Sequence, residues 1–325
     1  MSLDILRLAA TYLGYDLTAV RDMYQMAPKT YRRFCIKKSS GGHRAIYHPS
    51  GPTKALQYAL INLLLDKLPV HSSASAYHRG CSIVANARAH ASFAYSVRLD
   101  FSNFFPSIRP EDLLCRVTRV FGDISPESAE FVTSALFVRY ASGQMGLAVG
   151  APSSPAASNA TMIDIDQALS AFALARGGCY TRYADDLVFS TNVKSETAGF
   201  ALEVQHVLAG TASPSLRLNV RKTKYSSRAS RRIVTGLVIT PEGTVSVGRH
   251  NKRFVRKLLF DLSNDVLDKR SATYLKGYLA FLQDVEPDIL NKLALRYGGA
   301  VVDRAKRGPA RPIPADGSPS GPQLA

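Results

Sequence analysis

Two segments with the alternating pattern of β-strands carry acidic residues near their ends, and this arrangement limits the folds that the chain can adopt. Residues 96–101 alternate in this way and include Asp100. Residues 178–190 also read as extended, with Asp185 and Asp186 on a predicted tight turn. Strands that lie side by side in one sheet would bring the three carboxylates to one cavity, although 85 residues separate the first from the pair.

The three aspartates suit a magnesium site. Nucleotidyl transfer needs a deprotonated hydroxyl and a stabilised pyrophosphate, and two Mg²⁺ ions roughly 4 Å apart provide both. Mg²⁺ prefers carboxylate oxygens as ligands. Aspartates in a turn are also ordinary solvated turn formers, and a YxDD string alone is a weak motif. The aromatic and β-branched residues around each acid, and a third element between them, GLAVGAPSSPAASN, favour the catalytic interpretation.

The ordered set of motifs resembles the reverse transcriptases. Their palm carries an aspartate followed by aromatic residues, then a Gly/Pro/Ser-rich motif, then YxDD in a hairpin. Here YRRFCIKKSSGGHRAI resembles their triphosphate-gripping fingers motif, and LRLNVRKTKY resembles their lysine-bearing motif. The retron subfamily is suggested by NARAH, which matches the NAxxH pattern, and by the VTG triplet in RRIVTGLVIT.

The resemblance implies an α+β fold, the right-hand polymerase fold with fingers, a palm of antiparallel sheet plus helices, and a helical thumb. We expect N-terminal helices and fingers in residues 1–98, a palm in 99–245 with an inserted fingers segment at about 110–145, and a thumb in 246–303. Apolar residues at helical spacing within 254–262 and 274–282 independently predict two helices in that last region. The Pro- and Gly-rich residues 304–325 are expected to form a flexible tail.

The resemblance also assigns the residues around the reaction. Asp100, Asp185 and Asp186 would be catalytic, and together with Phe101 they would hold two Mg²⁺ ions. Lys222 matches a lysine proposed to protonate the departing pyrophosphate, although an exposed lysine without this role is an equal alternative.

The remaining nucleotide-binding assignments concern charge and shape. Lys38 and Arg44 would contact the triphosphate, and the alternative is a solvated basic loop. Phe105 stands where the family places an aromatic gate that selects dNTPs, but residue type alone favours a core aromatic. Gly150 would let the backbone approach the nucleotide and the template. Val149 replaces a glutamine common in relatives, which removes one polar contact to the nucleotide.

RNA-binding residues are expected at the retron motifs and in a basic stretch. Residue type favours a structural role for His90, and an RNA contact by Asn86 and His90 is the alternative. A strand carrying VTG is expected to contact RNA only because retron enzymes do so. Residues 217–257 contain 12 Lys or Arg against one acid, Glu242, and should lie along phosphates. The residues assigned to RNA are Asn86, His90, Val234, Thr235, Gly236, Arg249, Lys252, Arg253 and Arg256.

Bulk composition agrees with a nucleic-acid enzyme of the cytoplasm. Lys and Arg number 41 against 25 Asp and Glu, a net charge of +16 that should attract a polyanion. No long apolar run or signal peptide is visible. The four cysteines form no CxxC pair, which argues against a zinc site or a disulfide framework, and they are expected in the core.

The resemblance implies a structured noncoding RNA as the partner and dNTPs as substrates. Priming from an internal guanosine 2′-hydroxyl would yield a branched RNA–DNA product, multicopy single-stranded DNA (msDNA), and an effector protein encoded nearby would act with it in antiphage defence. Alternatives are another bacterial reverse transcriptase, of the group II intron or defence type, and an inactive RNA-binding scaffold. No membrane partner is expected.

Overall fold

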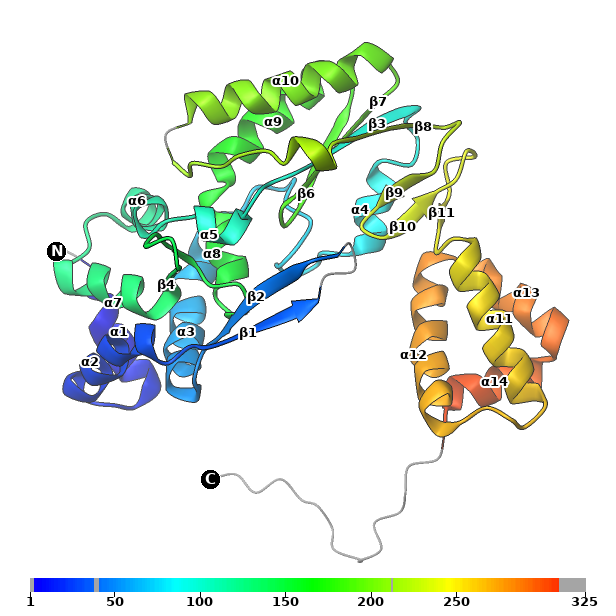
Figure 1. Ribbon diagram of the computed structural model, residues 1–325, viewed down its shortest axis with the longest axis horizontal. Helices are drawn as coiled ribbons and strands as arrows, with labels where there is room; N and C mark the ends of the chain where they lie inside the picture. The colour runs from blue at the N-terminus through cyan, green and yellow to red at the C-terminus, as the bar shows by residue number, and fades with distance from the viewer. Residues whose placement is uncertain (1–2, 38–40, 212, 310–325) are drawn as a thin grey trace, which may run out of the picture. The chain divides into compact units, whose positions relative to one another are not determined.

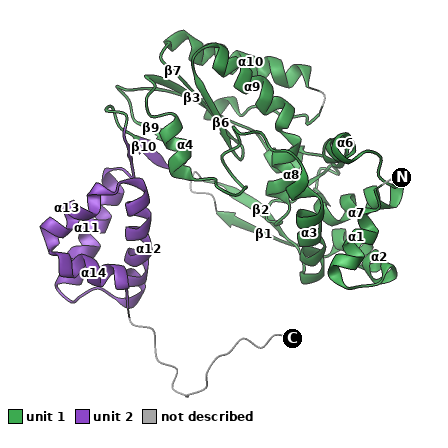
Figure 2. Cartoon of the chain, turned by 180° about the vertical axis from the view of Figure 1, so that it is seen from behind, with its two compact units in different colours: residues 1–235, 239–243 green, residues 236–238, 244–325 purple. Residues whose placement is uncertain are grey.

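The computed structural model describes residues 3–37, 41–211 and 213–309 (Figure 1). The chain divides into two compact units, one of residues 1–235 and 239–243 and the other of residues 236–238 and 244–325 (Figure 2). None of the helices in the described ranges is both long and apolar enough to cross a membrane.

The first unit holds most of the secondary structure. Its helices are α1 (Ile5–Leu13), α2 (Leu17–Met26), α3 (Gly51–Leu63), α4 (Ile83–Ala89), α5 (Phe104–Ser107), α6 (Pro110–Phe121), α7 (Pro126–Leu136), α8 (Ser154–Thr161), α9 (Ile163–Ala175) and α10 (Lys194–Gly210). Its longer strands are β1 (Arg32–Lys37), β2 (His43–His48), β3 (Tyr95–Asp100), β6 (Cys179–Tyr183), β7 (Asp186–Thr191) and β8 (Lys224–Ser227). Shorter strands are β4 (Phe137–Arg139), β5 (Met145–Leu147) and β9 (Arg232–Val234).

A four-stranded antiparallel sheet in the order β6-β7-β3-β8 positions the predicted acidic residues. Both predicted strand segments are confirmed, the first as β3 and the second as β6 and β7. Alternation buries Val97 and Leu99 on β3, whereas every residue of β7 after the first is buried. Helices α9 and α10 pack on this sheet (Figure 1). Phe189 of β7 stacks on Phe200 of α10, with ring centroids 4.6 Å apart, so aromatic contacts join helix and sheet.

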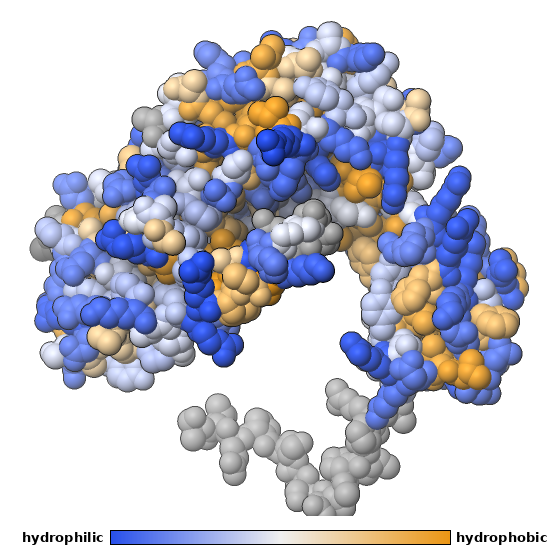
Figure 3. Space-filling view, viewed as in Figure 1, coloured by the Kyte–Doolittle hydropathy of each residue, from blue (hydrophilic) through white to orange (hydrophobic). Residues whose placement is uncertain are grey.

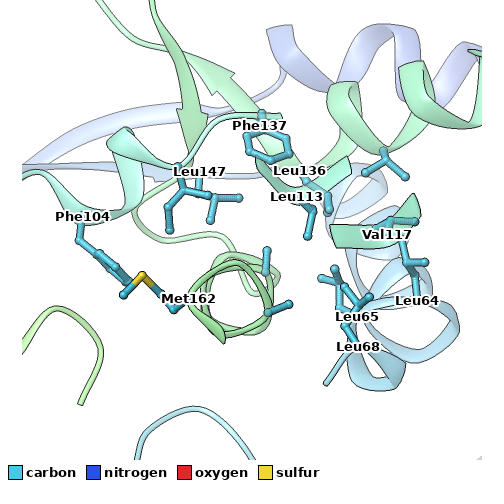
Figure 4. Close-up of a cluster of buried hydrophobic side chains, with 14 of the residues drawn as sticks. Leu64, Leu65, Leu68, Phe104, Leu113, Val117, Leu136, Phe137, Leu147 and Met162 are labelled. Carbon is cyan, nitrogen blue, oxygen red and sulfur yellow. The ribbon is translucent and has the colours of Figure 1, made fainter. Parts of the chain in front are cut away.

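The core continues from the sheet into the helices around α3, α6 and α7. Figure 4 shows one part of it, where Phe104 points toward Met162 and leucines from several helices meet. Strands β1 and β2 form a separate antiparallel hairpin in which Arg32 pairs with His48 and Lys37 with His43. All four cysteines are free, but Cys35 and Cys115 are exposed, so their predicted place in the core was wrong.

The second unit is mainly helical. It contains α11 (Arg249–Ser263), α12 (Lys269–Val285), α13 (Asp288–Tyr297) and α14 (Gly299–Arg307), and strand β11 (Val245–Ser246); β10 (Leu237–Ile239) lies at the division between the units. The helices expected from 254–262 and 274–282 are confirmed as parts of α11 and α12. Because α14 continues to Arg307, the prediction of a flexible tail was wrong for residues 304–307, and residues 310–325 lie outside the described residues.

Candidate active site

The register of the sheet brings the three aspartates together. Asp100, the last residue of β3, lies opposite Asp186, the first residue of β7. Directly opposed residues of an antiparallel pair have Cβ atoms roughly 4.5–5.5 Å apart on the same face. Just beyond the strand end, the Phe101 amide donates to the Asp185 carbonyl at 3.1 Å. The predicted meeting of a strand end and a hairpin tip is therefore confirmed.

The tight turn that carries Asp185 is held by a buried arginine that the sequence analysis missed. Arg182 is fully buried, and its guanidinium donates to both oxygens of Asp166 on α9, one of them at 2.6 Å. It also donates to the Ala184 carbonyl at 3.3 Å. Ala184 has a left-handed φ of 57°, a conformation that costs energy for a residue with a Cβ. The ion pair therefore fixes a strained turn next to the three converging aspartates.

Burial and mutual repulsion raise the pKa values of Asp185 and Asp186. Burial, against the opposing effect of Arg98 and with the charges of Asp185 and Asp100 adding to it, raises the pKa of Asp186 to about 6. Burial also raises the pKa of Asp185, with Asp100 adding to the effect. Closely spaced carboxylates with raised pKa values are stabilised in their charged form by a bound cation. The electrostatics of the site therefore fit divalent metal ions.

Lys222 contacts Asp100 directly. Its ammonium donates to both oxygens of Asp100, at 2.7 and 2.9 Å. In the described ranges, no three acidic, histidine or cysteine side chains are already grouped around one point. A metal ion at Asp100 would compete with the Lys222 ammonium for the carboxylate oxygens. The oxygen ligands themselves are of the kind that Mg²⁺ prefers.

Phe104 and Phe105 have different surroundings. Phe104 is 4% exposed and belongs to the core, as residue type alone predicted (Figure 4). Phe105 packs partly against that core and also lines a cavity of about 400 Å³ together with Gly150, Ala151 and Pro152. The structure thus brings the predicted gate residue and the predicted glycine to one cavity.

Gly150 is required by contact with β2. A Cβ at this position would lie 2.7 Å from Ile46 Cγ2 and 3.2 Å from the Tyr47 carbonyl, and φ is 114°. The preceding carbonyl, of Val149, accepts from the Tyr47 amide at 2.8 Å. The loop is thereby attached to the β1–β2 hairpin. On this hairpin Arg44 lies near enough to Asp185 to oppose the rise in its pKa, whereas Lys38 lies outside the described residues.

Comparison with known proteins decides the family. Residues 36–275 match the model of the family described as "Reverse transcriptase (RNA-dependent DNA polymerase)". The chain belongs to the reverse transcriptases. It is 33% identical to Retron Ec83 reverse transcriptase of Escherichia coli, covering 94% of this chain and 98% of the relative. It is 31% identical to Retron Ec73 reverse transcriptase of the same species, covering 83% and 88%.

This reverse transcriptase is therefore of the retron type, an RNA-directed DNA polymerase with the polymerase fold that its motifs predicted. Members of the family generally use divalent metal ions. Among solved structures, a foamy viral protease-reverse transcriptase in complex with double-stranded DNA matches with a TM-score of 0.49 and 14% identity, over 86% of this chain and 44% of the other.

The histidine of the NAxxH pattern has structural contacts in this reverse transcriptase. His90 is fully buried, and its two ring nitrogens lie 2.9 Å from the Ser190 hydroxyl and 2.8 Å from the Thr181 hydroxyl. Burial lowers its pKa to about 3, so the ring is neutral. His90 joins the end of α4 to β6 and β7, which agrees with the structural role that residue type favoured over an RNA contact. Asn86 is also buried, and its side-chain amide has no hydrogen-bond partner among the described residues.

The VTG triplet of the reverse transcriptase forms a strand end and a turn. Val234 is the last residue of β9 and is buried. Thr235 and Gly236 have φ values of 46° and 82°, and successive residues with positive φ are typical of a type I′ turn. The prediction of a strand was therefore wrong for these two residues. The Thr235 hydroxyl donates to the Ile83 carbonyl at 2.9 Å, so the two retron motifs meet at α4.

Some cations of the basic helix α11 are exposed to solvent, and one forms an ion pair within the unit. Arg249, Arg253 and Arg256 are exposed. Lys252 instead pairs with Glu286 of the same unit at 2.5 Å, with little of either side chain exposed. Hydrophilic residues cover much of this unit in the space-filling view, with smaller hydrophobic patches between them (Figure 3). The three arginines are available for an anionic ligand, whereas Lys252 contributes to helix packing.

Proposed function

We propose that this reverse transcriptase copies part of a structured noncoding RNA into msDNA. Synthesis would begin at the 2′-hydroxyl of an internal guanosine of that RNA, and the product would serve antiphage defence together with an effector protein. The similarity to named retron reverse transcriptases over almost their whole length supports the proposal. The observation that carries the chemistry is the opposed pair Asp100 and Asp186, with Asp185 attached to the same strand end.

In the proposed reaction Asp100, Asp185, Asp186 and Phe101 hold two magnesium ions. Bound there, the ions would lower the pKa of the attacking hydroxyl and neutralise charge on the pyrophosphate. Lys222 releases Asp100 and can donate a proton to the leaving group. Arg44 and Lys38 bind the triphosphate, and Phe105 and Gly150 form the floor of the nucleotide cavity. A palm at 99–245, fingers before it and a thumb at 246–303 are the corresponding domain assignments.

RNA recognition is assigned to charge on α11 and to the surface near α4. Arg249, Arg253 and Arg256 would contact phosphates, because guanidinium groups match phosphate oxygens and are exposed here. Thr235 and the exposed Gly236 lie at the junction of the two retron motifs and would contact the cognate RNA, while the buried Asn86 and Val234 would support that surface and His90 would hold α4 in place.

The test separates chemistry from RNA binding. Asp185→Asn should abolish primer extension on a generic RNA template in Mg²⁺ while leaving RNA affinity nearly unchanged, because the carboxylate serves the metal ions. Asp164→Asn is the control, since that aspartate pairs with Arg116 and Arg119 at the surface. Equal loss of both activities in folded Asp185→Asn would refute this division.

Nucleic acid that copurifies with the wild type should be cleaved by a debranching enzyme; an unbranched product would exclude guanosine 2′-hydroxyl priming.

A further inference from the structure

Tyr77 has a backbone conformation that bulky residues rarely adopt. Its φ is 68°, in the left-handed region, and the residue remains 45% exposed. Such a conformation costs energy and persists only where surrounding contacts impose it. The chain therefore holds this ring in place at some energetic cost.

The contacts that hold the Tyr77 segment come from the arginine beneath the catalytic turn. The Ser75 amide and hydroxyl both donate to the Arg182 carbonyl, at 2.8 and 3.0 Å. The Asn159 amide donates to the Ala76 carbonyl at 2.8 Å, and its own oxygen accepts from the Arg182 guanidinium at 3.2 Å. One buried residue thus fixes both the turn of Asp185 and the position of Tyr77.

The Tyr77 ring lies between the predicted gate and the catalytic hairpin. Its centroid is 6.5 Å from that of Phe105 and 6.3 Å from that of Tyr183, and it is inclined by 40° to both rings. Tyr77 also lines two cavities. One is the 400 Å³ cavity of Phe105 and Gly150, and the other, of about 960 Å³, contains Arg79 and Tyr183.

We propose that Tyr77 is a specificity-determining residue on which the new base pair rests as the incoming nucleotide meets the template base. The proposal depends on the assignment of the Phe105 cavity to the nucleotide. With the nucleotide in the Phe105 cavity, the larger cavity, which is lined by the cation Arg79, would take the template strand. Tyr77 lines both cavities and so lies on the boundary between them. Aromatic rings support any base, since every base has a π-face.

A fixed ring can discriminate by shape. A Watson–Crick pair has the same width for every sequence, whereas a mismatch displaces one base and loses contact with a surface that cannot follow it. Burial raises the pKa of the Tyr77 hydroxyl, and the nearby Asp185 adds to this effect, so the ring stays neutral beside the template. Removing the ring should therefore weaken selection of the correct nucleotide more than it slows synthesis.

The test compares Tyr77→Leu with Tyr77→Phe, both of which keep a Cβ at the same φ. The readout is the ratio of kcat/KM for the matched and a mismatched dNTP on a defined RNA template. Tyr77→Leu should lower this ratio about tenfold, the size expected for loss of one aromatic–base contact. Tyr77→Phe should keep it. Tyr15→Leu is the control, since Tyr15 is an exposed tyrosine between α1 and α2 and lines neither of the two cavities.

An unchanged ratio in folded Tyr77→Leu would overturn the proposal, and so would an equal loss in Tyr77→Phe, which would assign the effect to the hydroxyl. Phe105→Ala with rNTPs is measured in parallel. If rNTPs stay excluded while Tyr77→Leu accepts mismatches, the gate assignment fails and the role of Tyr77 stands. Absence of any extension by the wild type would contradict the polymerase assignment itself.

Discussion

The phenylalanines that follow Asp100 occupy different environments. Phe101 and Phe104 stack within the core, with ring centroids 5.6 Å apart, whereas Phe105 lines the cavity of about 400 Å³ that it shares with Gly150. The left-handed φ of 50° at Asn103 begins the short helix that orients these rings. A sequence pattern cannot separate two neighbouring rings, because which one faces the cavity depends on that local turn.

Phe105→Ala should admit rNTPs. Removal of the ring leaves space for a ribose 2′-hydroxyl, and a small group in a packed pocket changes discrimination by roughly 10–200-fold. The measurement is the ratio of kcat/KM for dGTP and GTP on one RNA template. Phe104→Leu serves as the control, with an unchanged ratio and a loss of stability of roughly 1 kcal/mol. Unchanged selection in Phe105→Ala would remove this residue from the gate.

His90 should make the fold sensitive to acid. The pKa is about 3 in the folded chain and about 6.5 when unfolded, so between these values only the unfolded chain is protonated. Stability then falls as pH falls, by roughly 1.4 kcal/mol per pH unit, starting near pH 6.5 and levelling off near pH 3.

Urea unfolding at pH 7, 6 and 5 measures this effect as the difference between the wild type and His90→Gln. The variant should be less stable at pH 7, and the gap should narrow as pH falls, because the glutamine cannot take up a proton. His206→Gln is the control, since that side chain is 85% exposed. A constant gap for His90→Gln would mean that the buried ring is not a source of the acid sensitivity.

At the scale of elements, α9 carries two aspartates with different roles. Asp166 faces inward and pairs with buried Arg182, whereas Asp164 faces solvent and pairs with Arg116 and Arg119. Removing one partner of a buried pair leaves an uncompensated charge and costs roughly 3–5 kcal/mol, while exposed pairs contribute about 0–1 kcal/mol.

Asp166→Ala should therefore lower the free energy of unfolding by roughly 3–5 kcal/mol, and Asp164→Ala by less than about 1 kcal/mol. Chemical denaturation of both variants provides the comparison. Because Arg182 also holds the Asp185 turn, Asp166→Ala should lose primer extension under conditions where it is still folded. Equal, small losses in the two variants would show that Arg182 finds another partner.

The sequence could predict the elements whose signal is local. Strands β3 and β6 follow from alternation, β7 from its short apolar run, and α11 and α12 from helical spacing. The aspartates converge because β3 pairs with β7 in one sheet. Helix α14 was missed because its charged sequence lies beside the Pro- and Gly-rich tail and is fixed by packing of Val302 and Ala305. The Arg182 pair and the Tyr77 conformation depend on contacts between distant segments, which no local pattern contains.

For the whole molecule, the structure reduces the number of cations that can bind RNA. Of the 12 in residues 217–257, Lys222 contacts Asp100, Lys252 pairs with Glu286, and Arg232 is buried with its guanidinium donating to the carbonyls of Phe93 and Thr240. A count from the sequence includes all 12 cations, because the partners that occupy three of them lie in other segments of the chain. The exposed arginines of α11 are among the cations that remain for phosphates.

Replacing Arg249, Arg253 and Arg256 with glutamine should therefore weaken RNA binding mainly by changing its salt dependence. Each lost phosphate contact lowers the slope of log K against log salt by roughly 0.7–0.9, so the triple variant should lose about 2–3 units of slope. RNA affinity measured from about 50 to 200 mM salt covers the range in which this is resolved. Glutamine at Lys29, Lys194 and Lys292, all exposed, removes the same net charge elsewhere. If both triple variants reduce the slope equally, net charge attracts the RNA, whereas a loss confined to the α11 variant assigns phosphate contacts to that helix.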